Sequence, residues 1–206
     1  MEVEVVAFDV DGTLTVRDCV FPFLLRAGGA GRMARAVLGH PVRLASLVLR
    51  RDRDGLKAHF VRECLAGLDA AVVSGLGAEF ASFVASGWIR SDTAAELRRH
   101  QDDGRVVVLV SASLSPYLEP LGEILEVDAV LCTGLEERDG LLTGELDGPN
   151  CRGDEKVVAL LRWAGEAGIS HDGWLTVAYG DSSGDNEMLA FARRGVNVSR
   201  SEVVAA

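Results

Sequence analysis

Two aspartates stand one residue apart at the end of an apolar, β-branched stretch, residues 3–8. A buried strand that ends in a turn accounts for Gly12 and Thr13, but folding gives no reason for Asp9 and Asp11 to stand there together. Two carboxylates this close raise at least one pKa unless a cation lies between them. The segment therefore indicates an Mg²⁺ site in which one aspartate is free to attack an electrophile. A strand followed by an acidic turn is the alternative.

More polar residues follow two later predicted strands. Residues 105–110 read as a buried strand that ends at Ser111, and residues 174–179 read as another, followed by Asp181 and Asp185. Strands and helices alternate at the spacing of parallel β-α-β units, and the carboxyl ends of such strands meet at one edge of the sheet. We therefore expect Ser111, Asp181 and Asp185 to lie beside the first aspartate pair.

Together these residues have the chemistry of a metal and phosphate site. The carboxylates of Asp9, Asp181 and Asp185 are the hard oxygen ligands that Mg²⁺ prefers. Ser111 offers a hydroxyl and flanking backbone amides to a phosphate. Lys156, near the start of a predicted helix, could hold the charge of the nucleophile and of a phosphoryl oxygen. Taken singly, each has a simpler alternative: a helix cap for Ser111, a surface lysine, and an acidic turn at 181–185.

The elements that must position these residues follow from the hydrophobic pattern. Apolar spacing near 3.6 predicts helices over four segments after the first strand: 18–27, 32–50, 55–66 and 70–86. Breaks are expected in the Gly-rich segment 28–31 and at Pro41. We expect an α/β fold: a doubly wound (Rossmann-like) parallel sheet formed by residues 1–14 and 88–206, with a small all-helical cap domain, residues 15–87, inserted after the first strand.

The rest of the predicted core alternates between helices and strands. Asp92 is expected to be the N-cap of a helix that Gly104 ends. The remaining helices are predicted at 116–126, 154–167 and 185–192, the remaining strands at 129–132 and 196–198, and a hairpin over 135–146.

Composition limits the partners. Of 206 residues, 48% are hydrophobic and 25% charged, and no apolar run approaches the ~20 residues of a membrane span. Glu2 and Glu4 replace the basic residues that start an export signal, so we expect a cytoplasmic protein without a membrane partner. The net charge of −10 argues against nucleic acid. Residues 15–90 nevertheless hold eleven Arg and Lys against six Asp and Glu, which suits a cover that meets an anionic substrate.

The motifs resemble those of one known family. Its four motifs correspond here to Asp9-x-Asp11-Gly12-Thr13, to Ser111, to Lys156 and to Gly180-Asp181-x-x-x-Asp185. This set resembles the haloacid dehalogenase superfamily, and the helical insertion after the first motif resembles that of its phosphoserine-phosphatase-like branch. The resemblance extends over essentially the whole chain.

The resemblance implies a role for each motif. It implies that Asp9 attacks phosphorus to form an aspartyl-phosphate, and that Asp11 protonates the leaving oxygen and then deprotonates the hydrolytic water. Ser111, the Ala112 amide and Lys156 would bind the phosphoryl oxygens. The Mg²⁺ ligands implied by the resemblance are the Asp9 carboxylate, the Asp11 backbone carbonyl and Asp181, with Asp185 either as a further ligand or as a residue that supports the ligands.

The insertion is expected to select the substrate. Asp18 stands where phosphoserine phosphatases carry a glutamate, although a helix N-cap is an equal alternative for it. Lys57, Phe60 and Arg62 surround the place of a cap arginine that has no clean counterpart here, and Gly184 replaces an asparagine. These departures argue against phosphoserine itself as the substrate.

We therefore expect an Mg²⁺-dependent phosphatase acting on a small phosphorylated metabolite, as a monomer or homodimer. A phosphotransferase that passes the phosphoryl group to an alcohol is one alternative. A phosphate-binding protein that keeps the fold without catalysis is another.

Overall fold

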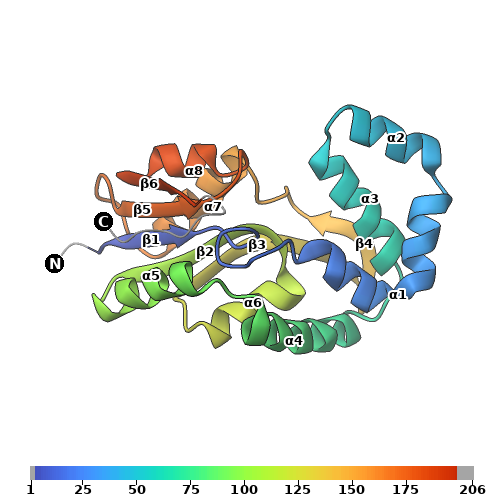
Figure 1. Ribbon diagram of the computed structural model, residues 1–206, viewed down its shortest axis with the longest axis horizontal. Coiled ribbons are helices and arrows are strands. Elements are labelled where there is room, and N and C mark those ends of the chain that lie inside the picture. Colours follow the sequence, from blue (N-terminus) through green and yellow to red (C-terminus); the bar gives the residue numbers. More distant parts are fainter. Residues whose placement is uncertain (1–2, 199–206) are drawn as a thin grey trace.

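The computed structural model describes residues 3–198 and places their strands in one six-stranded sheet of order β4-β3-β2-β1-β5-β6 (Figure 1). The strands are β1 (Val5–Phe8), β2 (Val106–Leu114), β3 (Ala129–Arg138), β4 (Leu141–Asp147), β5 (Leu175–Gly180) and β6 (Arg194–Asn197). β1 lies between β2 and β5 and is parallel to both, and only the β3–β4 hairpin pairs antiparallel. This confirms the doubly wound sheet.

Helices cover both faces of the sheet (Figure 1). Successive residues of a strand point to opposite faces, and β1 shows the result. Val6 and Phe8 join one buried cluster with side chains of α5 and α6, whereas Val5 and Ala7 join a second cluster with side chains of α7 and α8. These core helices are α5 (Ser91–Asp102), α6 (Ser115–Ile124), α7 (Asp154–Glu166) and α8 (Asn186–Phe191).

The segment after β1 is all-helical, as expected. Its helices are α1 (Val20–Leu38), α2 (Pro41–Leu49), α3 (Arg53–Leu65) and α4 (Ala70–Gly87). The expected break in the Gly-rich segment is a kink instead, because Gly29 alone leaves helical geometry with a φ of 75° and α1 continues beyond it. Pro41 begins α2, where its fixed φ suits the first turn.

The four inserted helices occupy two different places. α1, α2 and α3 project beyond the end of the sheet, and we call them the cap arm (Figure 1). α4 packs along core helix α6 so closely that a Cβ at Gly77 would lie 1.9 Å from the carbonyl oxygen of Pro116. By length and composition α4 could cross a membrane, but Phe80 and Val84 of this helix are buried in the core cluster.

Three of the differences from the predicted element boundaries concern β2, β3 and α5. β2 continues past Val110 to Leu114, because its pairing with β3 resumes after an irregularity between these two residues. β3 runs on to Arg138 as one side of the hairpin. Asp92 is not the N-cap of α5, since its carboxylate is held by the guanidinium of Arg90 at 2.8 Å and the helix begins at Ser91.

Candidate active site

The site lies where the carboxyl ends of β1, β2 and β5 meet beneath the cap arm. A cavity of about 1150 Å³ opens there. The structure brings together at its wall the predicted catalytic, phosphate-binding and metal residues from four separate segments of the chain: Asp9, Asp11, Ser111, Ala112, Lys156, Asp181 and Asp185.

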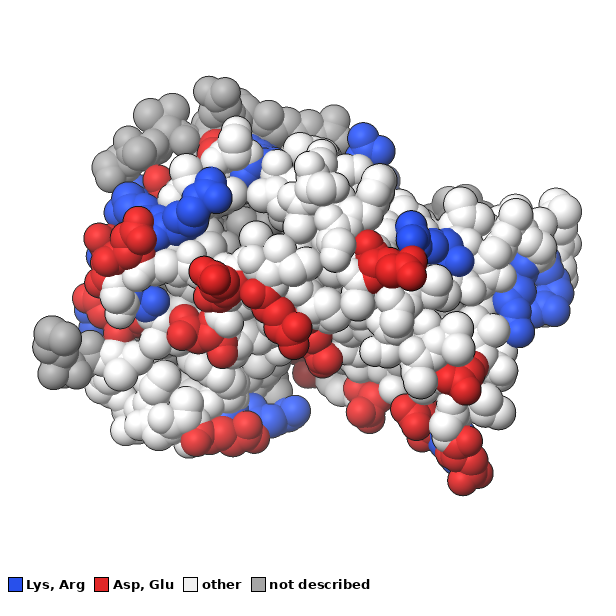
Figure 2. All heavy atoms as spheres, turned by 90° about the horizontal axis from the view of Figure 1, so that it is seen from below, with Lys and Arg blue, Asp and Glu red and all other residues white. Residues whose placement is uncertain are grey.

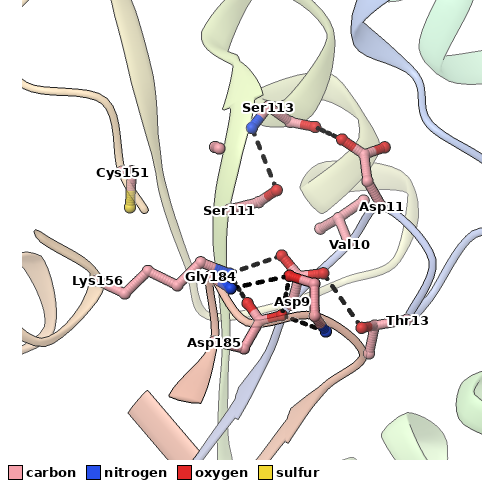
Figure 3. A network of polar contacts seen from close by, with 12 residues as sticks. Asp9, Val10, Asp11, Thr13, Ser111, Ser113, Cys151, Lys156, Gly184 and Asp185 are labelled. Atoms are coloured by element: carbon pink, nitrogen blue, oxygen red, sulfur yellow. Dashed lines mark hydrogen bonds and ion pairs between the residues drawn. The ribbon is translucent and has the colours of Figure 1, made fainter. Parts of the chain in front are cut away.

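A buried ammonium joins two of the aspartates. Lys156 Nζ lies 2.6 Å from Asp9 Oδ1 and 2.5 Å from Asp185 Oδ1, and the lysine is only 2% exposed (Figure 3). Thr13 donates to the other oxygen of Asp9 at 3.1 Å. Burial raises the pKa of Asp9, and attraction to Lys156 offsets part of this rise. Burial alone would lower the pKa of Lys156, but the two carboxylates outweigh it and raise that pKa.

A third carboxylate completes an oxygen-rich cluster. One oxygen each of Asp9, Asp181 and Asp185 lies within 4.8 Å of the others. Burial, followed by the charges of Asp9 and Asp185, raises the pKa of Asp181 to about 6. Gly12 has a φ of +86°, and a Cβ there would lie 2.3 Å from Asp181 Oδ2. The carboxylates, and the space that Gly12 leaves for them, fit a hard divalent cation such as Mg²⁺.

Asp11 belongs to a different environment. Its carboxylate points away from the cluster and accepts from Ser113 Oγ at 2.7 Å and from the Cys19 amide at 2.9 Å (Figure 3). Burial, reinforced by the charge of Asp18, raises the pKa of Asp11 to about 7. A carboxyl that titrates near neutral pH can give a proton and later take one.

The segment expected to bind phosphate is part of β2 and not a turn after it. Ser111 is 1% exposed, and its Oγ accepts from the Ser113 amide at 3.1 Å. The carbonyl of Ala112 accepts from Lys57 Nζ of the cap arm and from Thr133 Oγ1 of the neighbouring strand β3, the latter at 3.3 Å. The irregularity in β2 thus positions the hydroxyl of Ser111 next to Asp9 and Lys156 at the cavity wall (Figure 3).

Lys57 of α3 reaches from the cap arm to polar groups of the core. Its ammonium also donates to Asn150 Oδ1 at 2.6 Å, and Asn150 Nδ2 donates to Asp54 Oδ1 at 2.6 Å. Thr133 Oγ1 shares the same amide oxygen at 2.9 Å. Burial lowers the pKa of Lys57 to about 8. Lys57 lines the cavity, which its predicted role as a substrate residue requires.

The other expected substrate residues differ in position. Asp18 lines the cavity, as a substrate contact would require. Its carboxylate also accepts from the Phe21 amide at 3.3 Å, but the N-cap of α1 is Cys19, one position later than the predicted Asp18. Phe60 is buried and packs against the ring of Phe21, 5.1 Å between centroids, but does not line the cavity. Arg62 does not line it either, because Glu145 of β4 lies beside α3 and accepts from Arg62 Nε at 2.8 Å.

Several residues that line the cavity were not predicted from the sequence. Arg17 and Arg53 come from the Arg-rich insertion, whose charge was the one signal that could have singled them out. Arg152 and Asn150 stand before α7, and nothing in their local pattern marks them. The wall also has apolar members: Val16, Val20, Phe21, Leu56 and Val198.

Comparison with known proteins decides the family. Residues 6–190 match the model of the haloacid dehalogenase-like hydrolases. The chain belongs to this family. Its motifs and helical insertion put it in the phosphoserine-phosphatase-like branch of the haloacid dehalogenase superfamily.

Individual relatives agree with this assignment. Protein CicA of Caulobacter vibrioides is 39% identical over 197 residues, which cover 95% of this chain and 86% of that protein. Phosphoserine phosphatase SerB2 of Mycobacterium tuberculosis is 30% identical over 192 residues, 93% of this chain but only 43% of that longer protein. A solved structure, a phospho-aspartyl intermediate analogue of phosphoserine phosphatase, has a TM-score of 0.65 at 20% identity, covering 96% of this chain and 87% of that one, and shares the fold.

Proposed function

We propose that this protein is an Mg²⁺-dependent phosphatase that hydrolyses a small phosphomonoester through an aspartyl-phosphate intermediate. The observation that carries the proposal is the separation of two aspartates that stand two positions apart in the chain. Asp9 is held in the carboxylate cluster by Lys156, whereas Asp11 points away from it and burial raises its pKa to about 7. One carboxylate is thus arranged as a nucleophile and the other as a proton carrier.

The proposed reaction has two steps. A carboxylate oxygen of Asp9 forms a bond to phosphorus while the bond to the substrate oxygen breaks, and protonated Asp11 gives its proton to that leaving oxygen. Asp11, now ionised, takes a proton from a water molecule that attacks the same phosphorus, which frees Asp9 and releases phosphate. Lys156 and Ser111 hold the phosphoryl oxygens in place throughout.

A magnesium ion would add charge to this arrangement. The Asp9, Asp181 and Asp185 carboxylates and the backbone carbonyl of Asp11 are the proposed ligands. A bound Mg²⁺ would neutralise negative charge on the phosphoryl group and on the three carboxylates. Thr13 and Lys156 keep the Asp9 carboxylate in a fixed orientation.

The substrate is proposed to be a small phosphorylated metabolite. Phosphoserine phosphatases are among the similar proteins, which supports a phosphomonoester as the substrate class. The cavity wall combines the arginines Arg17, Arg53 and Arg152 with apolar Val20 and Phe21. That lining suits a substrate with both a further anionic group and an apolar portion.

Hydrolysis of p-nitrophenyl phosphate tests the reaction. We expect Mg²⁺-dependent phosphate release that EDTA abolishes and that Asp9→Asn removes. Asp11→Asn should lower kcat by about 10²–10⁴-fold while Mg²⁺ affinity, measured by calorimetry, stays near that of the wild type. Activity in Asp9→Asn, or an equal loss of metal binding in Asp11→Asn, would overturn the assigned roles.

A panel of metabolites then tests the substrate. Phosphoserine, histidinol phosphate, sugar phosphates and lysophospholipids should be compared by kcat/KM. We expect phosphoserine not to stand out. Transfer of the phosphoryl group to an added alcohol in preference to water would identify a phosphotransferase instead.

A further inference from the structure

The outer end of the cap arm carries apolar side chains that stand free in solvent. α2 has no buried residue, and its Val42 and Leu49 are each 83% exposed. Leu38, at the end of α1, is 77% exposed. Several large, exposed apolar side chains on α2 and at the end of α1 indicate an interaction surface.

The side chains of α2 form two stripes. Val42, Ala45 and Leu49 follow the i, i+3, i+7 spacing and therefore share one face of the helix. Arg43 and Arg50 are likewise seven positions apart, and they flank that face at the next position along the chain. An apolar stripe beside a basic one is typical of helices that lie in the interface of a membrane.

The charge of this region opposes that of the whole protein. Residues 32–53 contain six arginines and one acid, Asp52, in a chain of net charge −10. The carboxylate of Asp52 is already used, since it accepts from the Gly55 amide at 2.8 Å at the start of α3. None of Arg43, Arg50 and Arg51 forms an ion pair within residues 3–198. At the cap-arm end of the molecule, Figure 2 shows basic side chains in blue among white, uncharged residues.

We propose that residues 38–51, the cap tip, dock on the surface of an anionic lipid bilayer. Leu38, Val42 and Leu49 would enter the headgroup region while the arginines Arg43, Arg50 and Arg51 meet lipid phosphates.

A second copy of the chain fits the cap tip less well. A two-fold contact would bring the same patch of both copies together, and with it the unpaired arginines of each. None of residues 38–51 lines the large cavity, so docking is independent of the proposed reaction. The sequence argument against a membrane partner concerned segments that span a bilayer, whereas the cap tip would lie on its surface.

Sedimentation with vesicles tests the proposal without any activity assay. The protein should bind vesicles of equal parts phosphatidylglycerol and phosphatidylcholine, bind pure phosphatidylcholine at least about tenfold more weakly, and lose binding as salt rises. The double variants Val42→Glu/Leu49→Glu and Arg43→Glu/Arg50→Glu should each weaken binding to the anionic vesicles at least about tenfold.

Matched controls separate docking from folding. Val72→Glu on α4 and Arg98→Glu on α5 change an exposed apolar and an exposed basic residue elsewhere, and should bind like the wild type. Thermal unfolding checks that every variant is folded. The proposal fails if anionic vesicles do not pull down the wild type, or if both double variants still bind fully. It also fails if vesicle binding is absent and light scattering shows a dimer that Val42→Glu/Leu49→Glu dissociates.

Discussion

The ammonium of Lys57, on cap helix α3, donates to the side-chain oxygen of Asn150 in the core at 2.6 Å. The same ammonium donates to the carbonyl of Ala112, next to Ser111. One buried cation therefore ties the cap arm to the strand that is proposed to hold phosphate. The position of the cap arm and the orientation of that strand segment should change together.

Replacing Lys57 with methionine tests this connection. The variant loses hydrogen bonds from a charged donor, and a loss equal to one such bond, about 1.5–3 kcal/mol, lowers kcat/KM for p-nitrophenyl phosphate about ten- to a hundredfold. Arg62→Met, on the same helix but outside the cavity, is the control and should keep nearly all activity. Steady-state kinetics with saturating Mg²⁺ make the measurement. Equal effects in both variants would contradict a specific role for Lys57.

The raised pKa of Asp11 predicts how stability changes with pH. Its folded-state pKa of about 7 lies above the value of about 3.9 for an unfolded aspartate. The protonated form therefore stabilises the fold fully below pH about 4, and this contribution is lost as pH rises through about 7. The Asp11→Asn variant cannot ionise at this position. Its melting temperature should therefore rise relative to that of the wild type as the pH increases from about 4 to 8.

Melting curves in EDTA at several pH values measure this difference. Asp102→Asn, at an exposed position of α5, is the control for removing one negative charge. A difference between Asp11→Asn and the wild type that stays constant from pH 4 to pH 8 would be evidence against a buried, titrating carboxyl.

Gly12 offers a test of the carboxylate cluster. In Gly12→Ala the new Cβ would lie 2.3 Å from Asp181 Oδ2, at a φ of +86°. We expect Asp181 to be displaced, with Mg²⁺ affinity lowered at least tenfold in calorimetry. Gly140→Ala is the matched control, since it has a φ of +79° but nothing within 4 Å of its Cβ, so it adds only backbone strain of about 1–2 kcal/mol. Similar metal affinity in the two variants would show that contact with Asp181 does not matter.

Lys156 should be the most important single side chain for stability at the site. Lys156→Met leaves the carboxylates of Asp9 and Asp185 buried without their cation, and breaking a buried ion pair in this way costs about 3–5 kcal/mol. Urea unfolding without metal measures the loss. Arg138→Met, which removes a surface pair with Glu136, should cost at most about 1 kcal/mol. Mg²⁺ should stabilise Lys156→Met more than the wild type, because the cation replaces the missing charge.

The parts of the site that follow strands could be predicted from the sequence. The edge of a parallel sheet necessarily brings Asp9, Ser111 and Asp181 together, so strand periodicity and spacing were enough. Their detailed setting was not predictable. Polar residues after Val110 were taken as a turn, yet β2 absorbs them through an irregularity that depends on pairing with β3.

Contacts between the cap arm and the core were beyond sequence reasoning. Lys57 and Arg62 are both basic residues on one helix, but Arg62 is paired with Glu145 and Lys57 reaches Asn150. Each partner lies more than eighty positions away along the chain. Such outcomes depend on tertiary packing, which local pattern does not record. Asp92 was misread for a different, local reason, since Arg90 two positions before it binds its carboxylate.

The contact between α4 and α6 limits how this protein can be rearranged. Tyr117 of α6 packs against the ring of Phe80 at 5.4 Å between centroids, and both belong to the buried cluster that extends under the sheet. A graft that exchanged the whole segment 15–87 for another cap would uncover this side of the core. A graft that exchanged only α1–α3 would keep α4 in place, but it would have to preserve an apolar side chain at Phe23, whose ring packs 4.9 Å from that of Tyr117 and 5.7 Å from that of Phe80. The unit that natural variation or an engineer can replace is therefore smaller than the inserted sequence.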